Sequence, residues 1–359
     1  MQEVRAAVIG TGVMGRKYAQ MIAEGKAGAL RLTAVVCRSA GAQQWAKDTL
    51  PDTVRVCPSA DQLYDYAEEF DAVLVVTPHK THPALVMQAF AHGKHVLCDK
   101  PSANALAPAL EMNRAAEKSG LVFAMMFHQR RYKKYMRLKK LLDDGALGEI
   151  KRVQLENSRY FRTWMYHHSG SWRSSWAGEG GGALLNQGQH ILDIWQWLFG
   201  MPTSIYAVIP YGKYNDFMVD DEATLLMEYP QQRTATFILS TGEGSYTERL
   251  EIVGTKGTAL LEDLGNLAAN ELYRPDGSCL PPKQAAEKML AGIEAIAAQC
   301  NHLIIVSNEV FSGGADYAGE TDLYLQALAM VNNAVAAKAD AVCRVVCGLP
   351  VYYKGGERP

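Results

Sequence analysis

The chain has 359 residues, of which 48% are hydrophobic and 21% charged, so it can bury a large core and form two or more domains. Its net charge of -2 gives no electrostatic footprint for nucleic acid, and no apolar run approaches the ~18 residues of a membrane-spanning helix. Seven cysteines without C-x-x-C spacing argue against a zinc site or a disulfide framework, and an N-terminus that leads straight into an apolar strand argues against a secretory signal. We therefore expect a cytoplasmic protein.

Four short apolar runs in the first hundred residues alternate with segments that are predicted to be helices. The runs are residues 4–9, 32–36, 72–76 and 95–98. Short apolar strands separated by helices are typical of a parallel sheet with helices on both faces. The N-terminal part is therefore predicted to be a doubly wound α/β domain.

A glycine-rich turn at Gly10, Gly12 and Gly15 follows the first apolar run. Gly10 permits a tight turn, Gly12 lets the backbone approach a pyrophosphate, and Gly15 lets the next helix pack closely on its strand. The helix N-terminus would then face the phosphates. Such turns also serve as ordinary connections, but the strand before this one and the amphipathic segment 17–24 after it favour a dinucleotide site.

The end of the second apolar run bears on the choice of cofactor. NAD-binding proteins of this type usually place an acid there for the ribose 2′-hydroxyl, whereas this chain has Cys37, Arg38 and Ser39. An arginine beside a small hydroxyl residue can bind a 2′-phosphate, which favours NADP. Alternatively, Arg38 only stacks on the adenine, so both NADP and NAD stay open.

Four motifs together resemble the Gfo/Idh/MocA family of sugar and inositol oxidoreductases over about residues 4–275. They are the glycine turn, Thr77-Pro-His-Lys-Thr-His82, Asp99-Lys100-Pro101 and Gly180-Gly-Gly-Ala-Leu-Leu-Asn-Gln-Gly-Gln-His190. The resemblance implies a Rossmann domain at 1–124 and an α+β domain with an open, mostly antiparallel sheet at 125–275. It also implies a homo-oligomer, a dimer or a tetramer, formed through that sheet.

The resemblance makes Lys100 and His190 catalytic. The residues around Lys100 agree, because a following proline disfavours the helical region and predicts an extended lysine at a strand end, where α/β sheets bind ligands. A plain surface lysine is the alternative. Asp99 stands where the family usually has glutamate, and its shorter reach weakens any contact to the nicotinamide side.

The second predicted domain contains a helix, several strands and an unusual aromatic segment. The helix spans 133–144, and the strands span 150–161, 204–210, 223–229, 234–240 and a hairpin at 249–261, before a linker at 273–282. Rings, arginines and histidines at 160–176 suit the faces and hydroxyl edges of a sugar. Alternatively, these rings pack a domain junction. His167 and His168 lack a carboxylate at ligand spacing, so we expect no metal.

Residues 180–199 are predicted to form one amphipathic helix whose polar face carries a single charge. That face holds Asn186, Gln189, His190, Asp193, Gln196 and Trp197. A solvated face normally carries Lys and Glu, so we interpret this one as a pocket wall. A solvent-facing histidine is the alternative.

The mechanism expected for these residues is the oxidation of a secondary alcohol. His190 takes the hydroxyl proton near neutral pH, and Lys100 donates to the substrate oxygen and stabilises the developing alkoxide. Asn186 fixes the hydroxyl or the imidazole. Because the family usually has aspartate at that position, Asp193 becomes the candidate source of negative charge. The segment 172–187 resembles a branch of the family that oxidises glycosides at the sugar 3-hydroxyl.

The complete set of expected contacts follows from these motifs. Cofactor contacts are expected from Gly10, Thr11, Gly12, Val13, Met14, Gly15, Cys37, Arg38, Ser39, Thr77, Pro78, His82, Asp99, Lys100 and Gln129. Substrate contacts are expected from Tyr160, Trp172, Arg173, Trp176, Asn186 and His190.

The tail, residues 276–359, resembles the C-terminal part of the cobinamide kinase/cobinamide-phosphate guanylyltransferase family. The matching residues lie at 306–313, 331–337 and 347–350, and the predicted elements are helices at 283–299 and 321–339 and strands at 302–307 and 342–346. The sequence has no G-x-x-x-x-G-K-[ST] phosphate loop, so we expect no kinase or guanylyltransferase activity. A strand-helix-strand piece cannot cover both faces of its strands alone, so we expect the tail to dock on the dehydrogenase, to dock on another chain, or to stay poorly ordered.

Three function classes remain open. The favoured class is an NAD(P)-dependent sugar, glycoside or polyol dehydrogenase acting on a small molecule. The second is an NAD-dependent glycosidase that works through transient sugar oxidation. The third is a cobalamin-linked, non-catalytic nucleotide-binding protein.

Overall fold

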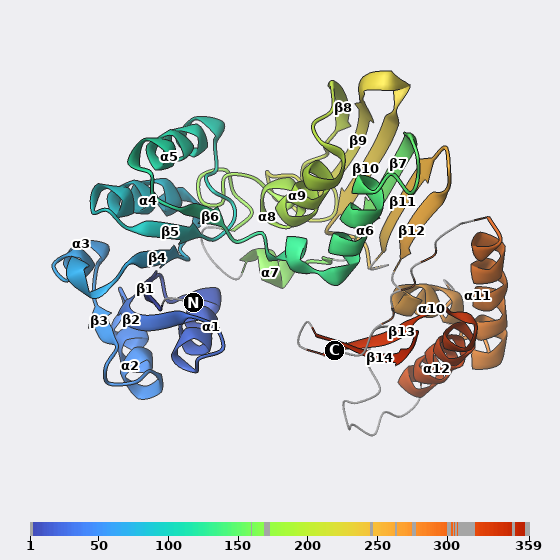
Figure 1. Ribbon diagram of the computed structural model, residues 1–359, viewed down its shortest axis with the longest axis horizontal. Helices are drawn as coiled ribbons and strands as arrows, with labels where there is room; N and C mark the ends of the chain where they lie inside the picture. Colours follow the sequence, from blue (N-terminus) through green and yellow to red (C-terminus); the bar gives the residue numbers. More distant parts are fainter. Residues whose placement is uncertain are drawn as a thin grey trace. The chain divides into compact units, whose positions relative to one another are not determined.

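The computed structural model describes residues 3–158, 160–168, 173–244, 247–262, 264–274, 278–299, 303, 305, 307, 320–346 and 349–355. Packing divides the chain into two compact units. One comprises residues 1–128, 167–190 and 217–219, and the other comprises 129–166, 191–216 and 220–359. Figure 1 labels the helices and strands described below. The predicted domain boundaries at 125 and 276 remain predictions, since this division follows packing and not chain order.

The first unit is built on a six-stranded sheet in the order β3-β2-β1-β4-β5-β6, and all neighbouring pairs are parallel. The strands are β1 (Val4–Ile9), β2 (Leu30–Val36), β3 (Arg55–Cys57), β4 (Ala72–Val75), β5 (His95–Cys98) and β6 (Phe123–Met125). The predicted doubly wound parallel sheet is thus confirmed. The edge strands β3 and β6 were not predicted, because three residues are too few to show a period.

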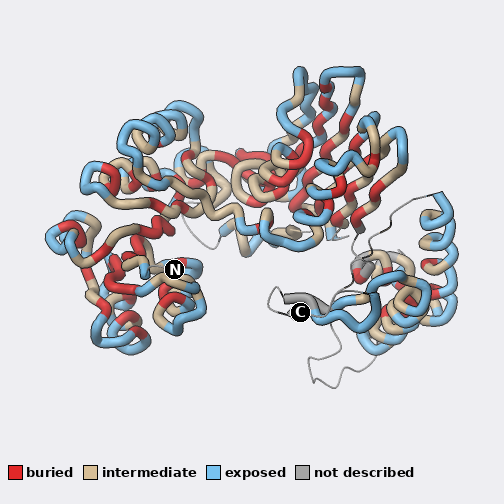
Figure 2. Tube along the Cα trace, viewed as in Figure 1, coloured by how far each residue is buried: buried red, intermediate tan, exposed pale blue. Residues whose placement is uncertain are grey.

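Helices cover both faces of this sheet. They are α1 (Val13–Ala23), α2 (Ala40–Thr49), α3 (Ala60–Tyr64), α4 (His82–Ala91) and α5 (Leu106–Ser119), with short 3-10 turns η1 (Ala67–Glu69) and η2 (His79–Thr81). Alternate residues of β1 point to opposite sides: Ala6 and Val8 pack with α1 and α2, whereas Ala7 and Ile9 pack with α3, α4 and α5. The buried strands between exposed helix faces are visible in Figure 2.

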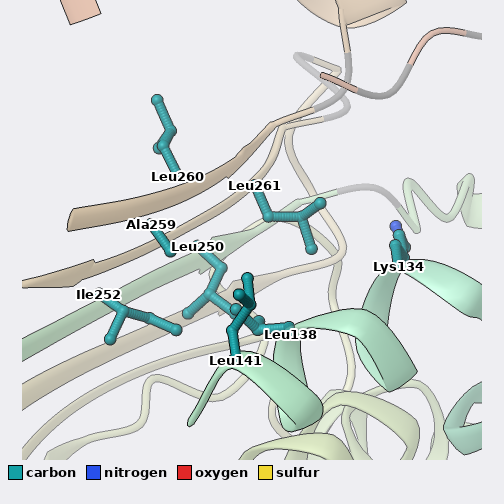
Figure 3. A pocket seen from close by; sticks show the side chains of 8 residues that line it. All are labelled: Lys134, Leu138, Leu141, Leu250, Ile252, Ala259, Leu260 and Leu261. Carbon is teal, nitrogen blue, oxygen red and sulfur yellow. The ribbon is translucent and has the colours of Figure 1, made fainter. Parts of the chain in front are cut away.

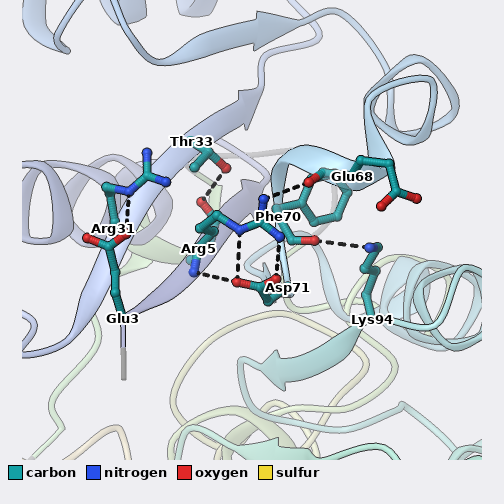
Figure 4. A network of polar contacts seen from close by, with 9 residues as sticks. Glu3, Arg5, Arg31, Thr33, Glu68, Phe70, Asp71 and Lys94 are labelled. Carbon is teal, nitrogen blue, oxygen red and sulfur yellow. Dashed lines mark hydrogen bonds and ion pairs between the residues drawn. The ribbon is translucent and has the colours of Figure 1, made fainter. Parts of the chain in front are cut away.

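A network of ion pairs and hydrogen bonds lies at the amino ends of β1, β2 and β4 (Figure 4). The Arg5 guanidinium donates to both carboxylate oxygens of Asp71, at 3.1 and 2.6 Å, and to the Glu68 carbonyl at 2.6 Å. These contacts lower the pKa of Asp71 to about 2. Since the strands are parallel, the loops that carry the predicted site all lie at the opposite edge.

The second unit contains a mixed sheet in the order β12-β11-β7-β10-β9-β8. Its strands are β7 (Ile150–Asn157), β8 (Ser204–Val208), β9 (Glu222–Glu228), β10 (Thr234–Ser240), β11 (Glu248–Gly254) and β12 (Thr258–Glu262). The β7–β10 pair is parallel and the other pairs are antiparallel, so the open, mostly antiparallel sheet is confirmed. Residues of β9 alternate between buried and exposed, as expected for a sheet covered on one face.

Helices of the middle of the chain pack around this sheet or carry site residues. They are α6 (Lys133–Asp143), α7 (Trp164–His168), α8 (Ala183–Asn186) and α9 (Gly188–Phe199), with 3-10 turns η3 (His128–Arg131) and η4 (Pro230–Gln232). The Trp195 ring of α9 packs edge-on against Phe237 of β10, with centroids 5.6 Å apart. The single helix predicted for 180–199 is wrong: the chain forms α8 and α9, divided at Gln187.

A small pocket lies between α6 and the strands β11 and β12 (Figure 3). It is lined by Lys134, Leu138, Leu141, Leu250, Ile252, Ala259, Leu260 and Leu261. The one charged lining residue, Lys134, donates to Glu248 at 2.6 Å, and the Tyr135 hydroxyl donates to the same oxygen at 2.7 Å. The lining of the pocket is therefore apolar apart from Lys134, which is already paired with Glu248. The pocket offers no side chain for acid–base chemistry.

The C-terminal elements are α10 (Leu264–Leu272), α11 (Pro282–Ala297), α12 (Glu320–Lys338), β13 (Val342–Val346) and β14 (Leu349–Lys354). The two predicted tail helices and the 342–346 strand are confirmed, and β14 pairs antiparallel with β13. The predicted strand at 302–307 and the segment 306–313 fall largely outside the described residues. Buried Ala268, Met289 and Leu328 share one apolar cluster, so α11 and α12 pack on α10. No helix in the described ranges is long and apolar enough to cross a membrane.

Candidate active site

The glycine turn after β1 has the shape of a phosphate cradle. Gly10 has φ +101°, and a Cβ atom there would lie 2.4 Å from the Val76 carbonyl oxygen. A Cβ on Gly15 would lie 1.9 Å from the Gly10 carbonyl oxygen, so α1 approaches β1 as closely as glycine allows. A Cβ on Gly12 would meet no atom within 4 Å, and no side chain caps the N-terminus of α1. The turn therefore fits a pyrophosphate above Gly12.

Residues around the cradle differ in what they offer a cofactor. Val13 is 88% exposed at the start of α1, although it is apolar. At the end of β2, Arg38 is exposed, the Ser39 hydroxyl caps α2 by accepting from the Ala42 N–H at 3.2 Å, and Cys37 is fully buried. Burial raises the pKa of the Cys37 thiol. Arg38 is thus the side chain of this trio that can reach a 2′-phosphate or an adenine ring.

His82 joins the loops that follow β4 and β5. Its two ring nitrogens each lie 2.7 Å from a backbone carbonyl oxygen, one of Pro101 and one of Thr77. The ring is fully buried, so any effect of His82 on a cofactor runs through the backbone that it holds. The Asp99 carboxylate accepts the Lys100 backbone N–H at 2.9 Å, and the Lys100–Pro101 peptide bond is cis. These contacts define the loop from which Lys100 projects.

The Lys100 ammonium group is held by Asn186, which is 86 residues away in the sequence. Nζ donates to the Asn186 backbone carbonyl at 2.7 Å and to its side-chain Oδ1 at 2.9 Å. Asn186 ends α8, where carbonyl groups lack helical partners. The division between α8 and α9 thus leaves a carbonyl oxygen for the lysine.

A buried carboxylate that the sequence analysis missed stands behind Asn186. Glu179 is 3% exposed; its side chain accepts from the Asn186 Nδ2, and its other oxygen accepts the Ser174 N–H at 2.8 Å. Burial raises the pKa of Glu179, although these donors and the charges of Arg173 and Lys100 oppose the shift. In the sequence, Glu179 is one acid within a glycine-rich loop, and no periodicity marks it.

His190 lies near Lys100 in the first unit, with an imidazole held mainly by other rings. Its ring makes edge-to-face contacts with His128 and Phe127, at centroid distances of 4.8 and 6.3 Å. Nδ1 is buried and has no hydrogen-bond partner among the described residues. Burial, and then the charges of Lys100 and His128, lower the pKa of His190 to about 3. The imidazole is therefore neutral at physiological pH, so its lone pair can accept a proton, but it is a weaker base than the ordinary pKa of ~6.5 used in the sequence analysis implies.

Asp193, the candidate source of negative charge for His190, is engaged by an arginine instead. Both carboxylate oxygens accept from the Arg130 guanidinium, at 2.7 and 2.6 Å. This bidentate geometry is typical of a strong ion pair. The structure therefore pairs Asp193 with Arg130, and the role of Asp193 as the source of negative charge for the imidazole stays a prediction. Glu179 is the carboxylate that the structure connects to Lys100 through Asn186.

Several predicted contact residues form pairs of their own. The Gln129 amide donates to the Tyr160 hydroxyl at 3.0 Å, which links a predicted cofactor residue to a predicted substrate residue. The Trp176 indole is half exposed and donates to the Met218 carbonyl at 2.7 Å. The charge of Arg173 acts on Glu179 and on His79. Trp172 lies outside the described residues.

His79 supplies a prediction for acid stability. It is 6% exposed, its Nδ1 lies 3.3 Å from the Glu179 carbonyl oxygen, and burial followed by the Lys100 charge lowers its pKa to about 4. Below pH ~6.5, the ordinary pKa of histidine, His79 is protonated in the unfolded chain but stays neutral in the native protein. The free energy of unfolding therefore falls as the pH drops from 6.5 towards 4.

The variant His79→Asn keeps an N–H donor for the Glu179 carbonyl oxygen but does not titrate. It should therefore remove the loss of unfolding free energy that protonation of His79 causes at low pH. Between pH 7 and 5 the variant should lose roughly 2 kcal/mol less of its free energy of unfolding than the wild type. Denaturant titrations at both pH values measure this, with His168→Asn at an exposed position as the control. An unchanged pH dependence in His79→Asn would contradict the assignment.

Family models match most of the chain. The model described as the oxidoreductase family, NAD-binding Rossmann fold, matches residues 4–127, and the GFO/IDH/MocA C-terminal domain matches 135–260. The model for cobinamide kinase/cobinamide phosphate guanyltransferase matches residues 219–353 and overlaps the second of these. The resemblances drawn from the motifs and from the tail are both confirmed.

Curated relatives and solved structures agree with this placement. The chain is 27% identical over 266 residues to an inositol 2-dehydrogenase of Mycolicibacterium vanbaalenii, covering 73% of each chain. It spans 46% to 61% of the length of four further relatives, which include dehydrogenases of a dihydrodiol and of scyllo-inositol.

Two solved structures show the fold. The WlbA dehydrogenase of Chromobacterium violaceum, solved with NADH and UDP-GlcNAcA, matches with a TM-score of 0.67 and 23% identity, covering 73% of this chain and 74% of that one. A protein from Desulfitobacterium hafniense, described as an NADPH-dependent oxidoreductase, matches with a TM-score of 0.63 and 18% identity, covering 94% and 96%. The second match includes most of the tail.

Proposed function

Because residues 4–127 and 135–260 belong to the Gfo/Idh/MocA family of oxidoreductases, we propose that this protein is an NAD(P)-dependent dehydrogenase. Its reaction is the oxidation of a secondary hydroxyl on a polyol, a sugar or a glycoside. The observation that carries the proposal is the pair of Lys100 and His190: an ammonium group held by Asn186, near an imidazole that its charge helps to keep neutral.

The mechanism assigns one task to each of these residues. The Gly10–Gly15 turn holds the pyrophosphate, and the bound nicotinamide supplies the hydride acceptor. The neutral His190 imidazole accepts the proton of the substrate hydroxyl. Lys100 donates a hydrogen bond to the same oxygen and stabilises its negative charge as the carbon is oxidised.

The proposed substrate class rests on the chemistry of the chain and on its relatives. The relatives named above act on vicinal diols and inositols, which carry neighbouring secondary hydroxyls. Trp176, which lies in the same unit as Lys100 and His190, is 50% exposed, so an aromatic surface is available to the face of a sugar ring. Within this class, oxidation of a glycoside at the 3-hydroxyl is the finer proposal. The exposed Arg38 favours NADP over NAD.

One panel of assays tests these proposals. The purified protein is offered NAD or NADP with inositols, free sugars and glycosides, and reduced nicotinamide and products are measured together. We expect reduced nicotinamide to accumulate with at least one member of the panel. Release of an aglycone without net reduction would instead select a glycosidase, and no reaction with any member would count against the proposal.

We also propose that the protein is a homo-oligomer that associates through its second sheet. Tyr206 and Leu226 pair across β8 and β9 and are 70% and 48% exposed, next to Val208 at 54%. Contiguous exposed apolar residues of this kind are typical of protein interfaces. Light scattering should show more than one chain per particle, and Tyr206→Glu should shift the mass towards a monomer. An unchanged mass would place the interface elsewhere.

A further inference from the structure

A hydrogen-bonded chain of three side chains runs from Lys100 through Asn186 to Glu179. One end of this chain can only donate hydrogen bonds, and the other end can only accept them. The Lys100 ammonium is a donor only, and it donates to Asn186 Oδ1 at 2.9 Å. The Glu179 carboxylate is an acceptor only, and it accepts from Asn186 Nδ2. The amide between them supplies the matching acceptor and donor, which fixes its orientation without ambiguity.

The environment of Glu179 keeps this arrangement in place. Its second oxygen accepts the Ser174 backbone N–H at 2.8 Å, so the carboxylate cannot turn without losing a bond. The charged and titratable groups that act on it are Arg173, Lys100 and His79, whose ring approaches the Glu179 backbone carbonyl. A buried carboxylate needs such partners, because burying an unpaired charge is strongly unfavourable.

Resting on the dehydrogenase function proposed above, we propose that Glu179 is a positioning residue that acts through Asn186. Its carboxylate orients the Asn186 amide so that Oδ1 faces Lys100, and its negative charge stabilises the ammonium form of the lysine. Lys100 is thereby held as a charged donor in the orientation that meets the substrate oxygen. The carboxylate that acts on Lys100 thus lies behind Asn186, on the opposite side of the amide from the lysine.

Glu179→Gln is the first test, because it keeps the shape of the side chain and removes one acceptor. If the Gln oxygen accepts the Ser174 N–H, its NH₂ group faces Asn186. The Asn186 amide must then turn and present its own NH₂ group to the Lys100 ammonium, donor against donor. We expect kcat to fall by about 10- to 100-fold, the effect of losing one hydrogen bond to a charged group, with little change in the KM for the cofactor. Glu117→Gln, at an exposed position on α5, is the matched control.

The double variant Asn186→Asp/Glu179→Gln is the decisive test. Here Ser174 N–H donates to the Gln oxygen, the Gln NH₂ donates to one Asp oxygen, and Lys100 donates to the other. All donors and acceptors of the original chain are matched, and the carboxylate now contacts Lys100. We expect the double variant to recover most of the activity lost in Glu179→Gln. The single variant Asn186→Asp places two carboxylates together, which must share a proton, so it is expected to be impaired.

The reactivity of Lys100 can be measured without any substrate. This measurement therefore tests the role of Glu179 even if the proposed dehydrogenase function is wrong. Competitive acylation by acetic anhydride at fixed pH, followed by mass spectrometry, compares Lys100 with the exposed Lys80 of the same molecule. Glu179→Gln should raise the relative labelling of Lys100 by about tenfold, since the ammonium loses a stabilising contact, and the double variant should reverse this. These ratios stand even if no substrate is found. Unchanged labelling and kcat in Glu179→Gln, or no recovery in the double variant, would overturn the inference.

Discussion

Replacing Lys100 by Met should lower kcat/KM by about 10²- to 10³-fold, the usual cost of removing a donor to a developing oxyanion. Met keeps the length and apolar stem of the side chain, but it cannot donate to the substrate oxygen. Steady-state kinetics with the substrate found in the panel measures the loss. Lys80→Met, at an exposed position in η2, is the matched control and should behave as the wild type.

The same variant should change the titration of His190. The Lys100 charge is the second cause, after burial, of a His190 pKa of about 3. Removing a neighbouring positive charge favours the imidazolium, so the pKa should rise, while burial keeps it below the ordinary ~6.5. Imidazole NMR signals recorded against pH report this shift directly. Wild-type turnover in Lys100→Met, or a His190 titration that does not move, would contradict the proposed pair.

Gly12→Val should weaken cofactor binding strongly and leave the fold intact, whereas Gly15→Ala should damage both. A Cβ at Gly12 enters open space within 4 Å. In the proposed site, the pyrophosphate needs that space. A Cβ at Gly15 would lie 1.9 Å from the Gly10 carbonyl oxygen, so α1 must move away from β1. We expect Gly12→Val to weaken NAD(P)H binding by more than about 100-fold, the equivalent of losing two charge-assisted hydrogen bonds.

Two measurements on the glycine variants distinguish these effects. Nicotinamide fluorescence gives the Kd, and thermal unfolding gives Tm in the absence of cofactor. Gly12→Val should keep the wild-type Tm, while Gly15→Ala should lower it. If Gly12→Val bound the cofactor as tightly as the wild type, the pyrophosphate would have to lie away from the glycine turn.

Local sequence patterns were sufficient for the first sheet and its cradle. Each main strand is a short apolar run next to a turn, and the roles of Gly10, Gly12 and Gly15 follow from the absence of a Cβ, so no distant contact is needed to predict them. The position of Lys100 after β5 also follows from strand order, because parallel strands end at one edge. Local patterns did not predict the three-residue edge strands β3 and β6. They also did not predict that residues 180–199 form two helices, α8 and α9.

The partners of the chemical groups were decided by contacts between segments far apart in the chain. Helical periodicity placed Asp193 on the polar side with His190, but it could not show that Arg130 occupies both oxygens of that carboxylate. Glu179 gave no periodic signal, yet folding places it behind Asn186 and makes it the carboxylate linked to Lys100. Residue type and spacing identify which groups can do chemistry, since these are properties of the covalent chain. Hydrogen bonds and ion pairs depend on distances of about 3 Å, which are defined only once the chain has folded.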